Sequence, residues 1–375
     1  MSRGRDEDRR ALGAAAAVAV GGAVALVGVA WRAPEAAHAP AAATASLAEA
    51  PPAATGAPQD APSPGSAPGG ARSRAFDTCK PPDPIGLGPY GPWIELPLGS
   101  LAIPQRGGHD AALGHDLWIH LHGFDAARRI VAEHARGVTY LGVDLGAGSG
   151  AYTRPFQEPH ALDELVRAVE VALVAHHHDP RAHVRRVGVS AWSAGYGAIV
   201  ELLRRDAQRL DAVVLLDAPH GSWARGPVAA PGPGDVSLRN LEPLVRFARR
   251  AAAGDALLVV THSAIQPPDY PSTRATADAL GRELGAHWRP LARGDDLYGP
   301  TREATLGRFF AWGFSGEDEG AHCAHLAHLE RALALAEARW ETPPLDRSVP
   351  PTPAPPRRPA PGTRRSGTIQ LELVE

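Results

Sequence analysis

The stretch RRVGVSAWSAGYGAIVELL, from Arg185 to Leu203, decides the fold of this chain. Its first half is rich in valine, which predicts a buried strand, and its second half carries apolar residues three and four apart, which predicts a helix. Ser193 lies where the two patterns meet. A strand that runs directly into a helix is the repeating unit of a parallel sheet, so further copies of the unit are expected on both sides of this stretch.

Short runs of strand-forming residues alternate with stretches of helical spacing on both sides of this unit. The predicted strands are Leu117–Leu121, Val138–Val143, Val184–Val189, Ala212–Leu216, Ala256–Val260 and Arg308–Trp312. The predicted helices are Ala126–Ala135, Ala161–His177, Ala194–Arg209, Leu238–Ala253, Thr273–Leu284 and Ala324–Trp340. This order predicts an α/β fold with a mostly parallel central sheet and helices on both faces. The segment Trp93–Ile103 is expected to add an antiparallel edge.

The two ends of the chain differ in composition from this central part. After an arginine-rich start, Ala11–Trp31 is uncharged and long enough to cross a bilayer. We expect residues 1–32 to be a signal peptide or a membrane anchor, with a buried helix of the fold as the remaining alternative. Residues 33–75 are dominated by Ala, Pro, Ser and Gly, which predicts a disordered linker. Residues 76–342 form the predicted catalytic domain, and residues 343–375 a proline-rich disordered tail.

Composition excludes several classes of protein. The 38 basic residues are balanced by 41 acidic ones, so the chain lacks the basic field that nucleic-acid binding requires. One long apolar run excludes a polytopic membrane protein, and two cysteines cannot form a disulfide scaffold. Cys79 and Cys323 are interpreted as isolated buried thiols, with a bridge between them as the alternative in an oxidising compartment. The domain is expected to be a monomer outside the cytoplasm, anchored or secreted.

Ser193 occupies the position of a nucleophile on a strand-to-helix turn. In a nucleophile elbow, small residues two before and two after the serine allow the strand and helix to lie close together. Ala191 and Gly195 hold these positions here. The serine hydroxyl then lies at the N-terminal end of a helix, where a developing negative charge is favoured. In a chain with 40 glycines the motif is weak alone, so its surroundings decide the interpretation.

Other polar residues follow the neighbouring strands. His122-Gly123-Phe124 ends the first strand, and Asp217 ends the strand after the elbow. His322 and His325 follow the last strand. Because the carboxyl ends of parallel strands share one edge of the sheet, these residues are expected to meet there. The backbone N–H groups of Phe124 and Ala194 are expected to form an oxyanion hole.

The chain from Trp93 to Trp340 resembles the α/β-hydrolase family in this combination of features. The resemblance implies that Ser193 is the nucleophile and that a histidine after the last strand is the base. His322 is preferred over His325, although one alanine separates it from Gly320. Asp217 is the preferred acid. Asp269 is the alternative, with Asp144 as a weaker one.

These assignments predict a serine hydrolase that cleaves carboxylic esters through an acyl-enzyme, with no cofactor and no metal. The substrate is expected to be a small-molecule or polymeric acyl ester. A short cap is predicted between Pro219 and Gly254. Trp192 and Tyr152 are the candidates for a substrate-binding wall.

Three rival interpretations remain open from the sequence. The fold also supports non-catalytic binding proteins, in which the serine only packs. A peptidase would use the same residues. A metal-dependent hydrolase would rest on His120, His122 and Asp125, although Gly123-Phe124 interrupts the usual metal-ligand pattern.

Overall fold

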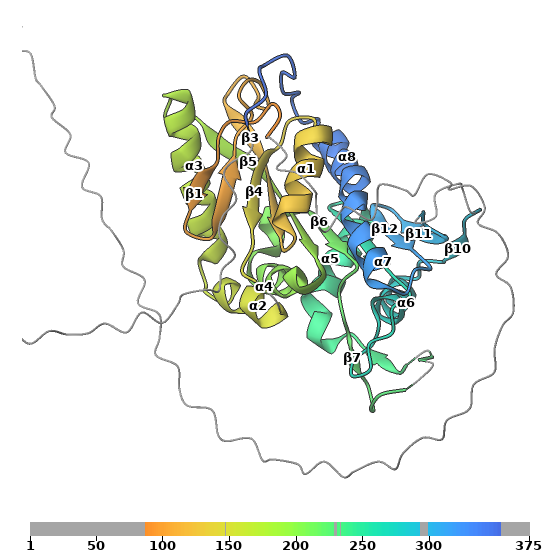
Figure 1. Cartoon of the computed structure of the whole chain (residues 1–375). Coiled ribbons are helices and arrows are strands. Elements are labelled where there is room, and N and C mark those ends of the chain that lie inside the picture. Colours follow the sequence, from red (N-terminus) through yellow and green to blue (C-terminus); the bar gives the residue numbers. More distant parts are fainter. Residues whose placement is uncertain (1–86, 147, 229–230, 233, 293–298, 354–375) are drawn as a thin grey trace, which may run out of the picture. The chain divides into compact units, whose positions relative to one another are not determined.

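The computed structural model describes residues 87–146, 148–228, 231–232, 234–292 and 299–353. This part of the chain contains a ten-stranded sheet with the order β1-β2-β4-β3-β5-β6-β9-β12-β11-β10 (Figure 1). Its strands are β1 (Ile94–Leu96), β2 (Gly99–Ala102), β3 (Gly114–Leu121), β4 (Thr139–Val143), β5 (His183–Trp192), β6 (Leu210–Leu216), β9 (Leu257–His262), β10 (Arg289–Pro290), β11 (Arg302–Leu306) and β12 (Phe309–Gly313).

The six central strands are parallel, and the two edges are antiparallel. β4, β3, β5, β6, β9 and β12 pair in parallel through the middle of the sheet. β1 and β2 form an antiparallel hairpin beside β4, as predicted for Trp93–Ile103, and β10 and β11 close the other edge. The central strands are mostly apolar and their middle residues are buried, which a parallel sheet covered on both faces requires. The predicted α/β-hydrolase-like architecture is confirmed.

Helices cover both faces of the sheet (Figure 1). They are α1 (Phe124–His134), α2 (Ser149–Phe156), α3 (Ala161–His177), α4 (Tyr196–Asp206), α5 (Glu242–Ala253), α6 (Thr273–Leu284), α7 (Glu319–Ala324) and α8 (Leu329–Trp340). Apolar residues of α2 to α6 share one core cluster with the sheet, whereas those of α1 and α8 belong to a second cluster. Two separate cores therefore hold the strands from opposite sides.

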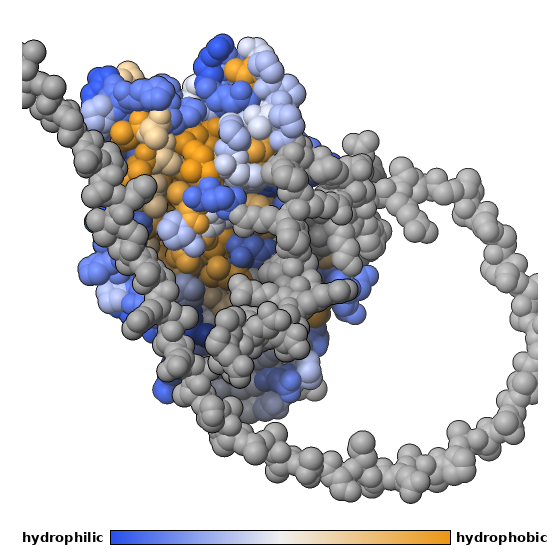
Figure 2. All heavy atoms as spheres, turned by 60° about the vertical axis from the view of Figure 1, so that its left-hand side comes forward, coloured by the Kyte–Doolittle hydropathy of each residue, from blue (hydrophilic) through white to orange (hydrophobic). Residues whose placement is uncertain are grey.

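One face of the molecule exposes apolar side chains near α3. Figure 2 brings the side that bears α3 and β1 forward and shows apolar residues gathered on it, with hydrophilic residues around them. Val171 of α3 is 66% exposed, the highest value among the large apolar residues that the structure describes. Exposure of a single apolar side chain such as Val171 is ordinary on a protein surface.

The insertion between β6 and β9 contains the predicted short cap. It holds a two-stranded ribbon, β7 (Ser222–Trp223) with β8 (Val236–Ser237), followed by α5. Only the ribbon stands apart from the sheet, because the apolar face of α5 belongs to the core. The cap is therefore shorter than the span from Pro219 to Gly254.

The predicted start of the solvated tail is wrong. Residues 343–353 lie along the domain, where Leu345 is 8% exposed and Thr352 pairs with Gly88. Arg347 also donates hydrogen bonds to the carbonyl oxygens of Ala132 and Ala135. The prediction relied on proline content alone. Residues 343–353, here called the strap, are extended and lack internal secondary structure, so their backbone and side chains are free to hydrogen-bond with the domain beside them.

The predictions for the remaining termini fall outside the described residues. This applies to the segments 1–32 and 33–75 and to residues 354–375. Within the described ranges, no helix has the length and apolar character needed to span a membrane.

Candidate functional site

The turn after β5 has the strained geometry of a nucleophile elbow. Ser193 has a φ of 48°, in the left-handed region that non-glycine residues rarely adopt. A Cβ atom on Gly195 would lie 2.3 Å from the carbonyl oxygen of Leu121 in β3 and 3.1 Å from the Cβ of Ala191. Glycine at 195 is therefore required by close packing, and the alanine at 191 fits only because position 195 has no side chain.

His322 and Asp217 come from distant parts of the chain and form a hydrogen-bonded pair. His322 Nδ1 lies 2.6 Å from Asp217 Oδ2. Asp217 follows the end of β6, and His322 lies in α7, whose first turn is capped by the Asp318 side chain through a 2.7 Å bond from the Ala321 N–H. A carboxylate can only accept, so the Nδ1 of His322 carries the proton and its Nε2 is left as a base.

Asp217 is held as a buried carboxylate by donors on both oxygens. It is 2% exposed. Its Oδ1 accepts hydrogen bonds from the Ser263 N–H at 2.8 Å and from the Thr273 hydroxyl at 2.6 Å. Burial would raise the pKa of Asp217, but the hydrogen bond from His322, the nearby imidazoles and the Thr273 hydroxyl hold this pKa well below its ordinary range. The carboxylate is thus ionised and fixed in direction.

Trp192 connects the imidazole to the elbow. Its indole N–H donates to the backbone oxygen of His322 at 3.0 Å, and its ring lies 4.7 Å from the His322 ring. Ser193 is the next residue, so this contact brings the segment that bears His322 against the elbow. No hydrogen bond joins the Ser193 hydroxyl to His322 in the described part of the chain. Such bonds are often long in a free enzyme and shorten when substrate binds.

The loop after β3 lies against the elbow. His122 and Gly123 have φ values of 70° and 72°, so the chain turns sharply into α1. A Cβ atom on Gly123 would lie 2.9 Å from the Trp192 ring, which shows how close this loop comes to the elbow. Phe124 is the first residue of α1, and Ala194 is the second residue of the 3-10 turn Ser193–Gly195. N–H groups at helix starts lack intrahelical acceptors and are available to an anion.

The structure places the alternative acid and base residues elsewhere. The backbone oxygen of Asp269 accepts a hydrogen bond from the Trp223 indole N–H at 3.2 Å. His325 is 1% exposed, and its Nδ1 lies 2.7 Å from the Thr261 hydroxyl. His328 stacks on Phe314 with ring centroids 4.3 Å apart. Of these candidates, only His322 and Asp217 face each other.

The candidate metal motif does not converge. His120 is buried in the core, where its Nδ1 lies 2.7 Å from the Ser190 hydroxyl. His122 turns instead toward Tyr152, and Asp125 is 69% exposed beside Arg128. Among the described residues, no three His, Cys, Asp or Glu side chains are arranged to hold a metal ion.

The buried histidines predict that acid destabilises the fold. Burial lowers the pKa of His120 and His262 to about 3 and that of His325 to about 4. The unfolded chain, with histidine pKa values near 6.5, then binds more protons than the folded chain between about pH 6.5 and these folded values. Stability is therefore lost as pH falls through this window. Each histidine is expected to cost on the order of 1 kcal/mol between about pH 7 and about pH 5.5.

Urea denaturation at several pH values measures this loss. His325→Asn is expected to reduce the dependence of unfolding free energy on pH, because it removes one buried titrating group. His160→Gln, at a side chain that is 76% exposed, is the matched control and should leave the dependence unchanged. A free energy of unfolding that stays constant across this pH range would contradict the prediction.

The prediction that Tyr152 lines the substrate wall is wrong. Tyr152 is 0% exposed, and its hydroxyl is occupied by Asp144, Leu145 and His122. α2, which carries it, was not predicted from the sequence. The substrate-binding role of Trp192 stays a prediction; the structure shows its contacts with the His122 and His322 rings.

His220 and Tyr270 were not singled out as a pair from the sequence, although they lie near the His322–Asp217 pair. Their ring centroids are 4.6 Å apart, and His220 Nδ1 lies 3.0 Å from the Pro271 backbone oxygen. Burial lowers the pKa of His220, while Asp217 raises it and His322 lowers it. The position of His220 directly after the strand that ends in Asp217 was the available signal.

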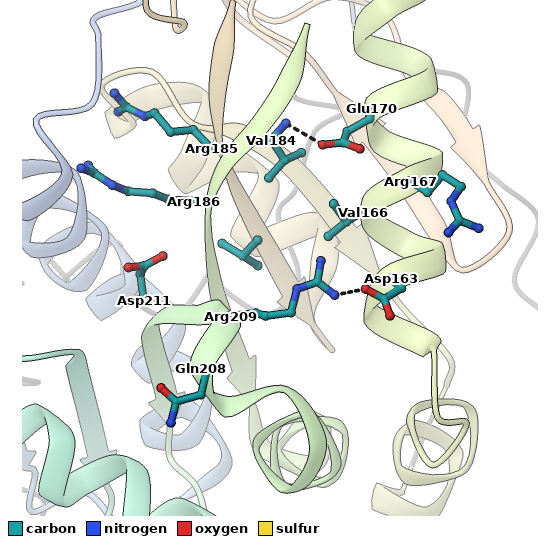
Figure 3. A pocket seen from close by; sticks show the side chains of 11 residues that line it. Asp163, Val166, Arg167, Glu170, Val184, Arg185, Arg186, Gln208, Arg209 and Asp211 are labelled. Carbon is teal, nitrogen blue, oxygen red and sulfur yellow. Dashed lines mark hydrogen bonds and ion pairs between the residues drawn. The ribbon is translucent and has the colours of Figure 1, made fainter. Parts of the chain in front are cut away.

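One cavity beside the sheet is remote from this site, and a smaller one adjoins it. A cavity of about 470 Å³ lies between α3 and β5 at the amino-terminal end of β5. Figure 3 shows Arg209 bonded to Asp163 and Glu170 bonded to the Val184 N–H, while Arg185 and Arg186 extend to one side and Arg167 to the other. Its charges are thus paired or dispersed. A cavity of about 190 Å³ adjoins the site, lined by Phe124, Asp144 and the β1–β2 hairpin.

Cys323, next to His322, is disulfide-bonded. The interpretation of the cysteines as isolated thiols is therefore wrong for this residue. The other cysteine of the chain is Cys79, which lies outside the described residues.

Comparisons with known proteins give distant likenesses in structure alone. No family model matches the chain, and no curated protein matches its sequence. A cold-adapted esterase from an Arctic intertidal metagenomic library is 15% identical, over 64% of this chain and 92% of that chain, with a TM-score of 0.34. The enterobactin esterase of Shigella flexneri is 12% identical over 70% of this chain, with a TM-score of 0.41, and the match spans 64% of its length. The carboxylesterase CesB of Bacillus subtilis is 10% identical, over 72% of this chain and 95% of that chain, with a TM-score of 0.35.

Proposed function

We propose that this protein is a serine hydrolase that cleaves carboxylic esters through an acyl-enzyme. The observation that carries the proposal is the 2.6 Å bond between His322 Nδ1 and the buried Asp217 carboxylate, beside the strained elbow that presents Ser193. A histidine held in one tautomer by a buried carboxylate, next to a serine on a sharp turn, is the arrangement that activates a hydroxyl.

In the proposed reaction, Ser193 Oγ adds to the ester carbonyl as its proton passes to His322 Nε2. The Phe124 and Ala194 N–H groups stabilise the resulting oxyanion. The carbon–oxygen bond to the alcohol then breaks, and the alcohol leaves with the proton from His322. Water, deprotonated by the same imidazole, attacks the acyl-enzyme and releases the acid, which restores the Ser193 hydroxyl.

Labelling with a fluorophosphonate probe tests the proposal, combined with turnover of p-nitrophenyl acyl esters of increasing chain length. The expected result is one covalent adduct, mapped to Ser193 by mass spectrometry, and loss of turnover in proportion to labelling. Absence of both labelling and turnover would favour a binding protein on the same fold. Turnover that is lost with a chelator, without labelling, would favour a metal-dependent hydrolase.

We also propose that the protein acts outside the cytoplasm, anchored or secreted, as a monomer. The uncharged run Ala11–Trp31 after an arginine-rich start supports export. Cell fractionation tests the location: activity confined to the cytoplasm would contradict it. Size-exclusion chromatography with light scattering tests the monomer.

A further inference from the structure

We infer that His122 recognises the substrate: its Nε2 is a fixed hydrogen-bond acceptor for a hydroxyl group that the ester carries near its carbonyl. This inference rests on the proposed ester hydrolysis and adds a substrate class to it. It is carried by the contacts of one hydrogen-bonded chain of groups, Asp144, Tyr152 and His122, which the proposed reaction does not use.

The first step concerns the single hydrogen of the Tyr152 hydroxyl. Tyr152 Oη lies 2.9 Å from Asp144 Oδ1, and the Asp144 side chain is 46% exposed. A solvated carboxylate has no proton to give, so the hydrogen between these two oxygens belongs to Tyr152. The Leu145 N–H also donates to the Tyr152 oxygen, at 3.1 Å. The Tyr152 hydroxyl therefore donates its single hydrogen to Asp144 and has no hydrogen left to donate to His122.

The second step fixes the tautomer of His122. Its Nδ1 lies 2.9 Å from the same Tyr152 oxygen. With the phenolic hydrogen already given to Asp144, this contact is a hydrogen bond only if Nδ1 carries a proton. Burial lowers the pKa of His122 and outweighs the opposing effect of Asp144, while His322 lowers it further, so the ring is neutral near pH 7. A neutral ring protonated on Nδ1 has an unprotonated Nε2.

The third step places this Nε2 in the site. Within the described residues it has no protein partner, and it is absent from the buried unpaired atoms, so it is open to a ligand. The His122 ring stacks on Trp192 with centroids 5.0 Å apart and planes 11° apart, and Trp192 in turn contacts His322. Stacking holds the ring plane, and Tyr152 sets its rotation. His122 is thus preorganised as an acceptor in the loop after β3, two residues before Phe124.

The chemistry of the acceptor defines the substrate class. An unprotonated imidazole nitrogen with its other nitrogen occupied accepts one hydrogen bond and offers none. It favours an ester with a hydroxyl over the same ester without one, because only the former offers this nitrogen a donor when the ester excludes solvent from it. The hydroxyl can belong to the acyl chain or to the alcohol, and two pairs of esters separate these sources.

The experiment compares kcat/KM for matched esters. p-Nitrophenyl β-hydroxybutyrate against p-nitrophenyl butyrate tests the acyl side, and ethylene glycol monobutyrate against propyl butyrate tests the alcohol side. The wild-type protein is expected to prefer the hydroxylated member of one pair by roughly 3- to 10-fold, the worth of one neutral hydrogen bond. His122→Phe, which keeps a flat ring against Trp192, is expected to abolish this preference.

Tyr152→Phe separates recognition from a structural role. It keeps the packing of α2 but removes the oxygen that fixes the tautomer, so the preference is expected to fall while turnover of the unhydroxylated ester changes little. Tyr90→Phe is the matched control, because the Tyr90 hydroxyl donates to the Val138 backbone oxygen at 2.9 Å and has no contact with His122. It should keep the full preference.

Nitrogen-15 spectra of the full chain read the tautomer without turnover, with the His122 signals assigned from their loss in His122→Phe. Protonation on Nδ1 is expected in the wild-type protein, and a mixture of tautomers in Tyr152→Phe. Protonation of His122 on Nε2, or equal rates for both members of both pairs in an active enzyme, would overturn the inference alone. Failure of all four esters to react would count against the proposed function.

Discussion

Ser193→Ala is expected to lower kcat/KM for ester hydrolysis by on the order of 10³-fold or more, with little change in the fold. The loss is large because alanine leaves no oxygen to form the acyl-enzyme, whereas the His322–Asp217 pair and the oxyanion donors stay in place. The strained φ of 48° at this position remains, since the backbone path is fixed by the contact of Gly195 with β3. Residual activity would come from water that is oriented in the same site.

The measurement needs a control for contaminating esterases and for unfolding. Ser348→Ala, at an exposed serine near the carboxyl-terminal strap, is the matched variant and should retain wild-type kcat/KM within about two-fold. Circular dichroism compares the fold of all three proteins, and titration with the fluorophosphonate gives the fraction of active sites. Undiminished hydrolysis by Ser193→Ala would remove the serine from the mechanism.

The parallel sheet could be predicted because its strands need no tertiary information to be recognised. The buried parts of β3, β5, β6 and β9 are covered on both faces, so each contains a stretch rich in apolar residues. α2 was not predicted from the sequence, because it has only eight residues, and Gly148 before it and Pro155 within it weaken the helical pattern. β10 consists of Arg289–Pro290 and exists only through pairing with β11. Pairing of this kind depends on a partner that local sequence does not reveal.

Chain order explains why Ser193 and Asp217 were expected to lie close together, whereas the preference for His322 over His325 depended on helix phase, which the sequence indicates only weakly. Ser193 and Asp217 follow adjacent strands, so topology alone brings them to one edge of the sheet. The choice between His322 and His325 depends on which side of a short helical segment faces Asp217, and the sequence gives equal apolar surroundings to both. The structure buries His325 against Phe314 and turns His322 outward.

The position of the Tyr152 ring also could not be predicted from the sequence. Its position after the second predicted strand correctly indicated proximity to the site. Whether its ring lines the substrate wall or lies beneath it depends on the packing of α2 against the 3-10 turn at Ser193, which the sequence does not encode locally. Through its hydrogen bonds with Asp144 and His122, Tyr152 positions the His122 ring. No sequence motif indicates this role.

Asp217→Asn is expected to lower kcat by about 10⁴-fold, a loss comparable to that of the nucleophile, although it changes only one atom and preserves the volume of the side chain. The asparagine oxygen takes the place of Oδ1, because the Ser263 N–H and the Thr273 hydroxyl both donate there. The amide nitrogen must then face His322 at the position of Oδ2. It donates where the carboxylate accepted, so the hydrogen bond persists only if the proton on His322 moves from Nδ1 to Nε2.

That change of tautomer removes the base from the site while leaving the pair intact. A protonated Nε2 cannot accept the Ser193 proton, so acylation slows although substrate still binds, and KM is expected to change much less than kcat. Asp269→Asn is the matched variant, since it makes the same substitution at the exposed alternative acid and should keep kcat within about two-fold. Nitrogen-15 spectra of His322 report the tautomer directly. If Asp269→Asn lost activity and Asp217→Asn kept it, the buried pair would be structural, and the 2.6 Å bond would serve to hold α7 on the sheet rather than to orient a base.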